Sequence, residues 1–438
     1  KAYDDAAIVT FSRFGRENMD LKTNNVPGHS NEDDHYLQLD DNELALIKLA
    51  KANFKKVIVM INSSMIMQIP ELQAGTDTEY GVDAILWVGG LGDQGTLAAA
   101  HILTGEVNPS GHTSDLWYAD FTKDPTFTNF GDMSQNKDSG GNRMNSWFTY
   151  ANGDTSVFSS VEFREGIYYG YRYYETKAAD MNASSAGTGD TWYAENVLYP
   201  FGFGLSYTTF EWELAGISAD KTISAANQTI TMKVKVTNTG DVAGKDVVQM
   251  YYTAPYTSGG IEKSSVVLGD YAKTRLLQPG ESDVVTLQMV AQDMASFDWN
   301  DANGNGFIGY ELEAGDYVIS AQRNSHEAVI SETYKIADGI QCATDYTTGN
   351  PINAAFVDDF DTTRESLLDH MISRANGLEQ PAAQTAEERV MSQVEADILD
   401  AEETYYPYMD EEGQPWYVSE VPEGWTQDAA TAVTPADL

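Results

Sequence analysis

The sequence predicts an α/β layered domain, followed by an all-β sandwich and an acidic C-terminal linker. Up to residue 107, continuous apolar runs alternate with amphipathic stretches, whereas from about Phe210 apolar and polar residues alternate one by one. Residues 336–438 then carry 22 Asp and Glu against 3 Lys and Arg, a net charge of −19. We therefore expect three regions, at residues 1–209, 210–335 and 336–438.

Residues 1–107 are predicted to alternate between strands and helices. The expected strands are the apolar runs Ala6–Ser12, Val57–Ser63 and Ala84–Gly89, which are typical of parallel strands covered on both faces. The expected helices are Glu43–Phe54, capped by Asp41 or Asn42, and Asp93–Thr104. Such an order predicts a parallel sheet with right-handed crossovers, and sheets of this kind bind ligands beyond the carboxyl ends of their strands. The segment after Ser12 is therefore a natural place for chemistry.

The rest of the chain shows two other patterns. Residues 108–205 are rich in Gly, Asn, Asp, Tyr and Trp with weak periodicity, so we expect long ordered loops with short strands there. Short alternating strands separated by turn residues predict a β-sandwich, and they are expected at Thr229–Val236, Val247–Tyr252, Val284–Met289 and Tyr317–Ala321. Within the acidic linker, a helix is expected around Thr385–Ala401.

Charge limits the possible partners. The chain has 26 Lys and Arg against 67 Asp and Glu, a formal net charge of −41. Because such a surface repels phosphate backbones and anionic headgroups, we expect neither nucleic acid nor a membrane as partner, whereas a neutral sugar is compatible with it. Cys342 is the only cysteine, which excludes an intrachain disulfide and a cysteine-rich metal site. No signal peptide is visible, and localisation stays open between cytoplasm and secretion.

Several stretches resemble one family. Tyr199–Phe210 (YPFGFGLSYTTF) closely resembles the YPFGYGLSYT signature of glycoside hydrolase family 3, found where the α/β-sandwich domain meets the fibronectin type III-like domain. Arg164–Tyr174 (REGIYYGYRYY) is similar to the family's EGIYVGYRYY segment, Asn108–Gly111 to its NPSG, and Trp87–Gly95 to its Gly-rich strand-to-helix turn. The resemblance covers roughly residues 1–335. It implies a partial α/β-sandwich domain, lacking its N-terminal part, and then an immunoglobulin-like, fibronectin type III-like sandwich. We interpret the signature as structural.

The resemblance also implies a catalytic residue. The family uses two carboxylates, a nucleophilic Asp on a (β/α)8 barrel and an acid/base Glu on a loop of the α/β-sandwich domain. Ser12–Asp20 (SRFGRENMD) resembles the loop SR-x-GGEG-x-D that carries this Glu, which places Glu17 at the catalytic position with Arg13 and Asp20 as substrate-binding residues. Arg16 stands where the family has a Gly, and a positive charge favours the ionised carboxylate, the wrong direction for an acid. The alternative is that Glu17 is a solvated residue paired with Arg13 or Arg16.

Other candidate sites have simpler interpretations. Glu32, Asp33 and Asp34 beside His35 are read as a solvated acidic run rather than a metal site. Asp301–Gly306 has the spacing of a calcium loop, but Leu312 occupies position 12, where a bidentate Glu is required, so we expect a β-turn. Neither a metal nor a cofactor is predicted.

Exposed aromatic residues could stack on sugar rings or pack against an absent domain: Trp117, Tyr118, Trp147 and Phe148.

No barrel is visible in the sequence, so no nucleophile can be assigned. Met371–Asn376 is similar to a linker associated with members whose barrel comes last, which favours a barrel after Leu438. The leading hypothesis is part of a retaining exo-β-glycosidase, a β-glucosidase, acting on small oligosaccharides or aryl and alkyl β-glycosides, with the barrel in the same chain or in a partner. β-Xylosidase and N-acetylglucosaminidase activities, a split enzyme, and a non-catalytic carbohydrate-binding or cell-surface module remain alternatives.

Overall fold

The computed structural model describes residues 3–15, 21–128, 163–352 and 370–382, and four short strands outside these ranges. Those strands form two antiparallel hairpins, β5 (Ser146–Thr149) with β6 (Thr155–Phe158) and β18 (Tyr406–Met409) with β19 (Pro415–Val418). The helix expected around Thr385–Ala401 lies outside the described residues. No helix in the described part of the chain is long and apolar enough to cross a membrane.

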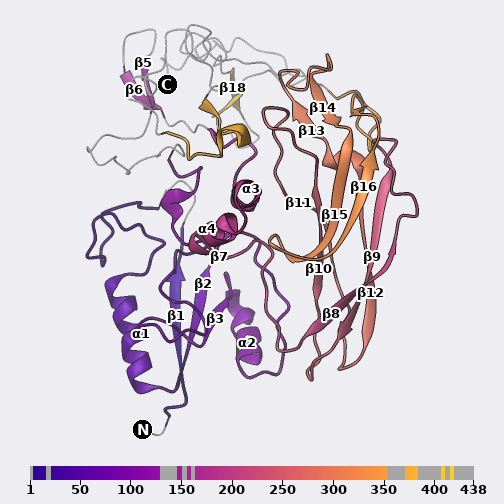
Figure 1. Cartoon of the computed structure of the whole chain (residues 1–438). Coiled ribbons are helices and arrows are strands. Elements are labelled where there is room, and N and C mark those ends of the chain that lie inside the picture. Colours follow the sequence, from indigo (N-terminus) through magenta and orange to yellow (C-terminus); the bar gives the residue numbers. More distant parts are fainter. Residues whose placement is uncertain are drawn as a thin grey trace.

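The N-terminal region contains a three-stranded parallel sheet in the order β1–β2–β3 (Figure 1). Its strands are β1 (Ala6–Arg13), β2 (Lys56–Ser63) and β3 (Ala84–Trp87), and its helices are α1 (Asp41–Asn53) and α2 (Gly92–Leu103). The parallel pairing confirms the prediction made from the continuous apolar runs.

One face of this sheet is covered more completely than the other within the described residues. Along β1, Val9 and Phe11 are buried, whereas Ile8 on the opposite face is 53% exposed. Helix α1 covers the buried face with Ile47 and Ala50, which pack in one core with β1 and β2. The expectation that both faces are covered holds only in part in the described chain, because Ile58 and Met60 on the opposite face of β2 are half-buried, whereas α2 buries only Ala99.

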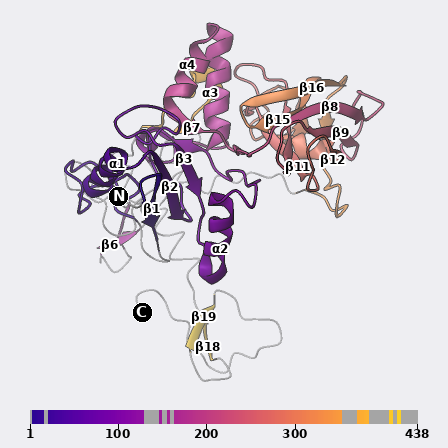
Figure 2. The same cartoon turned by 90° about the horizontal axis from the view of Figure 1, so that it is seen from below.

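Residues 108–205 contain two helices that the sequence did not predict. Helix α3 (Tyr171–Ser184) and helix α4 (Thr188–Asn196) pack together, and the rings of Tyr174 and Trp192 stack at 5.5 Å. The short strands β4 (Trp117–Tyr118) and β7 (Val197–Tyr199) pair beside them, and η1 (Phe121–Lys123) follows β4. Both views place α3 and α4 between the parallel sheet and the β-rich region (Figures 1 and 2).

Residues 210–341 form a β-sandwich, the fold that the sequence predicts there. One sheet has the order β11–β10–β15–β16 and the other β12–β9–β8, and a small third sheet has the order β13–β14–β17. The core between the two large sheets consists of buried side chains at alternate positions, such as Ile230, Met232 and Val234 of β9. The strands are β8 (Phe210–Ile217), β9 (Thr229–Asn238), β10 (Val247–Thr253), β11 (Val267–Lys273), β12 (Ser282–Val290), β13 (Ser296–Asp298), β14 (Gly309–Leu312), β15 (Gly315–Asn324), β16 (Glu327–Ile336) and β17 (Ile340–Gln341).

Candidate active site

The candidate loop leaves the carboxyl end of β1. Glu17 and Asp20 lie outside the described residues, but the structure fixes the residues on either side of them. A Cβ built on Gly15 would lie 3.6 Å from both Leu21 Cδ2 and Met65 Sδ. The two ends of the segment therefore lie together, next to the residues that follow β2.

Arg13 is the last residue of β1 and is only 8% exposed. Its guanidinium binds Glu43 in a bidentate manner, with Nη1–Oε1 and Nη2–Oε2 distances of 2.7 and 2.6 Å. Nε donates to the carbonyl oxygen of Tyr36 at 2.7 Å, and the two remaining N–H groups donate to the carbonyl oxygens of Ser12 (3.0 Å) and Gln38 (2.6 Å). All five donors of Arg13 are therefore used inside the protein.

This network changes the interpretation of Arg13. The predicted alternative paired Glu17 with Arg13 or Arg16, but the carboxylate paired with Arg13 in the described chain is Glu43. Direct contact between Arg13 and a substrate stays a prediction. What the geometry shows is an anchor that ties the end of β1 to the start of α1 and to residues 36–38.

Glu43 was missed in the sequence, although a signal for it exists. The N-cap of α1 is Asp40, one residue before the predicted Asp41 and two before the predicted Asn42. Asp40 Oδ1 accepts from Glu43 N at 2.7 Å, and Glu43 Oε2 accepts from Asp40 N at 3.0 Å, which is a reciprocal capping box. The pattern Asp40-x-x-Glu43 could have identified the helix start, but not the pairing with Arg13.

His35 lies in the long connection between β1 and α1, and its side chain ties this connection to other parts of the domain. Its Nδ1 accepts from Leu37 N at 3.2 Å, so Nε2 carries the proton of the neutral ring and donates to Gln68 Oε1 at 3.1 Å. The ring stacks on Phe121 at 5.0 Å, and burial lowers the pKa of His35. This histidine is therefore a neutral core residue. No group of three or more His, Cys, Asp or Glu that could hold a metal occurs in the described ranges.

The carboxyl ends of the three strands lie side by side. Arg13 pairs with Ser63, and Ile61 pairs with Trp87, whose Nε1 donates to the carbonyl oxygen of Ser63 at 2.6 Å. The Gly-rich turn after Trp87 therefore opens on the same edge as the candidate loop. Trp117, which we considered as a sugar platform, is instead buried against Trp87.

The signature residues join the two large regions, which confirms their structural interpretation. Gly202 has φ +78°, and a Cβ on it would lie 2.0 Å from Gln249 Oε1 of β10. Gln249 Nε2 in turn donates to the carbonyl oxygen of Gly202 at 2.9 Å. Asn108 of the NPSG segment bonds Ser206 Oγ, Tyr207 N (2.8 Å) and the carbonyl oxygen of Ala243 (3.1 Å).

A buried carboxylate adds a second connection. Glu175 of α3 accepts from Tyr193 Oη at 2.6 Å and from Ser325 Oγ at 2.8 Å, and its Oε2 lies 2.8 Å from His326 Nδ1. Ser325 and His326 belong to the β15–β16 turn of the sandwich. The hydrogen bond to Glu175 raises the pKa of His326.

The calcium-like loop is a turn between β13 and β14. Asp301 has φ +55°, and its Oδ1 accepts from Gly306 N at 2.9 Å. Asn303 and Asn305 donate to the two carboxylate oxygens of Glu311 at 2.8 and 2.6 Å. The predicted turn is confirmed.

Comparison with known proteins now connects these features to a family. Residues 1–171 match the model of the glycosyl hydrolase family 3 C-terminal domain, and residues 246–325 match that of the fibronectin type III-like domain. β-Glucosidase A of Butyrivibrio fibrisolvens is 35% identical over 362 residues, covering 77% of this chain and 38% of that protein. This chain thus spans well under half of the length of that relative.

Two solved structures show the same arrangement. A β-glucosidase from Paenibacillus barengoltzii superposes with a TM-score of 0.59 at 29% identity, over 77% of this chain and 31% of that one. β-Glucosidase 3B of Thermotoga neapolitana, solved in complex with α-D-glucose, superposes with a TM-score of 0.57 at 30% identity, over 77% of this chain and 38% of that one. The chain therefore belongs to glycoside hydrolase family 3 and contains its C-terminal α/β domain and its fibronectin type III-like domain.

Proposed function

We propose that this chain is part of a retaining exo-β-glycosidase, a β-glucosidase that removes terminal non-reducing β-D-glucosyl residues. The anchored start of the Ser12–Asp20 loop is the observation that carries this proposal. Arg13, buried and fully bonded, holds the loop's first residues at the carboxyl edge of the sheet. Open α/β sheets bind ligands at that edge, and relatives named β-glucosidases support the sugar class.

The proposed mechanism uses two carboxylates on different domains. An Asp of a (β/α)8 barrel, in the same chain or in a partner, attacks the anomeric carbon and forms a glycosyl-enzyme, while the Glu17 carboxyl protonates the leaving oxygen. The Glu17 carboxylate then takes a proton from the water that releases the sugar. In this scheme Arg13 is a positioning residue, and Asp20 contacts the substrate.

Product stereochemistry tests the reaction class. The protein isolated from its native source is mixed with an aryl β-glucoside, and the first anomer released is identified by proton NMR. A retaining enzyme gives the β-anomer first, and early release of the α-anomer would overturn the two-step mechanism. Intact mass of the same sample shows whether a barrel is covalently attached. A mass near 48.1 kDa, without partner or hydrolysis, would favour a non-catalytic carbohydrate-binding module.

A further inference from the structure

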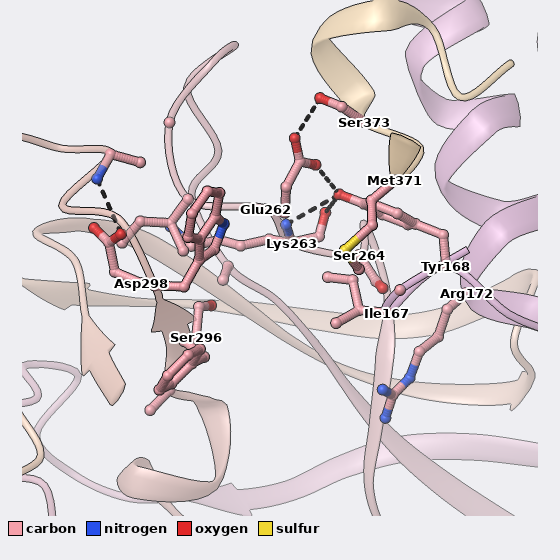
Figure 3. Close-up of a pocket in the computed structure, with 18 of the residues that line it drawn as sticks. Ile167, Tyr168, Arg172, Glu262, Lys263, Ser264, Ser296, Asp298, Met371 and Ser373 are labelled. Carbon is pink, nitrogen blue, oxygen red and sulfur yellow. Dashed lines mark hydrogen bonds between the residues drawn. The ribbon is translucent and has the colours of Figure 1, made fainter. Parts of the chain in front are cut away.

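A cavity of about 610 Å³ lies where the sandwich meets the beginning of α3 and residues 371–373 (Figure 3). Its volume falls within the range of roughly 300–1,000 Å³ that is typical of small-molecule sites. Arg13 does not line this cavity, nor do the other described residues of the candidate loop.

Aromatic side chains form part of its lining. Trp299 and Tyr310 line the cavity and remain 41% and 43% exposed, although they are large and apolar. Tyr310 lies across the strand pair from Phe297, which also lines the cavity, and the two ring centroids are 4.9 Å apart. A rigid aromatic surface of this kind can stack against the apolar C–H face of a sugar ring.

Charged groups of opposite sign line the cavity. Arg172 of α3 and Asp298 of β13 both line the cavity and lie on opposite sides of the view in Figure 3. Within the described chain Arg172 has no carboxylate partner, and its guanidinium interacts only with the side chains of neighbouring tyrosines, by a hydrogen bond with Tyr171 and by lying over the Tyr169 ring at 5.5 Å. Asp298 is 1% exposed, and its Oδ2 has no hydrogen-bond partner among the described residues. Buried polar atoms normally have partners, so this lining is incomplete.

Two further polar groups define the remaining wall. Ser264 Oγ is buried, lines the cavity and has no hydrogen-bond partner in the described ranges. Glu262, by contrast, accepts from Tyr168 Oη and Ser373 Oγ, which holds residues 371–373 against the sandwich. Glu262 is thus a structural residue, whereas Arg172, Ser264 and Asp298 are available to a ligand.

We propose that this cavity, at the junction of the sandwich and α3, binds a neutral saccharide of one or two rings. A guanidinium without a carboxylate partner in the described chain, one buried carboxylate and a hydroxyl match the hydroxyl groups of a sugar, and the aromatic rings match its apolar face. The net charge of −41 disfavours an anionic ligand. The choice of a saccharide among neutral polar ligands rests on the proposed glycosidase function.

Titration calorimetry with glucose and cellobiose on the full 438-residue chain tests this site. We expect saturable binding in the millimolar range that weakens about tenfold in Arg172→Gln and in Trp299→Ala, the loss expected for one hydrogen bond to a charged group or one stacking contact. Arg275→Gln and Tyr271→Ala are matched controls, since they remove an exposed arginine and an exposed aromatic ring elsewhere on the sandwich. Circular dichroism checks that each variant is folded.

The outcomes separate this proposal from the proposed catalytic function. Binding that persists in Glu17→Ala and weakens about tenfold in Trp299→Ala supports the cavity, whatever the catalytic tests show. Absence of binding by the folded wild-type chain would overturn the proposal. Binding that is equal in wild type, Arg172→Gln and Trp299→Ala would overturn it as well, because the sugar would then lie elsewhere.

Discussion

Replacing Glu43 by alanine should destabilise the α/β domain more than any surface charge change. One side chain has two tasks in this structure. It binds both Nη atoms of Arg13 at the end of β1, and it completes the capping box that starts α1. Removing it therefore leaves a buried guanidinium without its counter-ion and a helix N-terminus with one fewer acceptor.

The size of the effect follows from burial. The side chain of Arg13 is 7% exposed and that of Glu43 is 18% exposed. Removing one partner of a buried ion pair costs about 3–5 kcal/mol, because the remaining charge is uncompensated. Because Glu43 is partly exposed, the cost of breaking the ion pair should lie near the lower end of that range. Loss of the capping interaction adds roughly 0.5–1 kcal/mol. We expect a loss of about 3–4 kcal/mol in the free energy of unfolding.

Hydrogen exchange measured by mass spectrometry on peptides of β1 and α1 resolves this change by domain. The matched control is Glu79→Ala, since Glu79 pairs with Lys48 of α1 at 2.8 Å but is 66% exposed. That variant should leave exchange unchanged, because exposed pairs contribute little. Glu43→Gln, which keeps the shape but loses the charge, should fall between the two. Equal exchange in Glu43→Ala and Glu79→Ala would refute the role of the Arg13–Glu43 pair.

Two further predictions concern the connections between the domains. Gly202→Ala should lower stability by more than about 2 kcal/mol, because its Cβ would overlap Gln249. Gly280 has φ +80° and open space around it, so Gly280→Ala should lose only the cost of a left-handed backbone, about 1 kcal/mol. Thermal unfolding measures both changes. The raised pKa of His326 predicts a contribution to stability that is complete below about pH 6.5 and lost as the pH rises through the folded-state value. Urea unfolding across this pH range measures the free energy of unfolding, and in His326→Ala this contribution to its pH dependence should be absent. The same pH dependence in His326→Ala and wild type would contradict the prediction.

Periodicity predicted much of the fold because burial in those elements follows a single simple pattern. Strand β9 alternates between core and solvent, and the strands of the parallel sheet are continuous apolar runs. Helix α3 was missed because the consecutive residues Tyr173, Tyr174, Glu175 and Thr176 are all buried. A helix that is covered on several sides has no single apolar stripe to detect.

The candidate site was predictable only in part. The loop after β1 could be identified from its place in the α/β order and from its motif. The partner of Arg13 could not, because Glu43 lies 30 residues away and nothing local specifies the contact. The cavity beside Trp299 was equally hidden, since it brings together α3, the sandwich and residues 371–373.

The central claim is that Glu17 is the acid/base of a two-carboxylate glycosidase. The dependence of kcat/KM on the leaving group in Glu17→Ala tests this claim most directly. Wild type and Glu17→Ala, both as the complete enzyme that we propose, are compared on aryl β-glucosides with good and poor leaving groups. The account predicts that kcat/KM of Glu17→Ala falls by orders of magnitude on poor leaving groups and much less on good ones, which leave without protonation. Near-wild-type activity of Glu17→Ala on poor leaving groups would contradict the account.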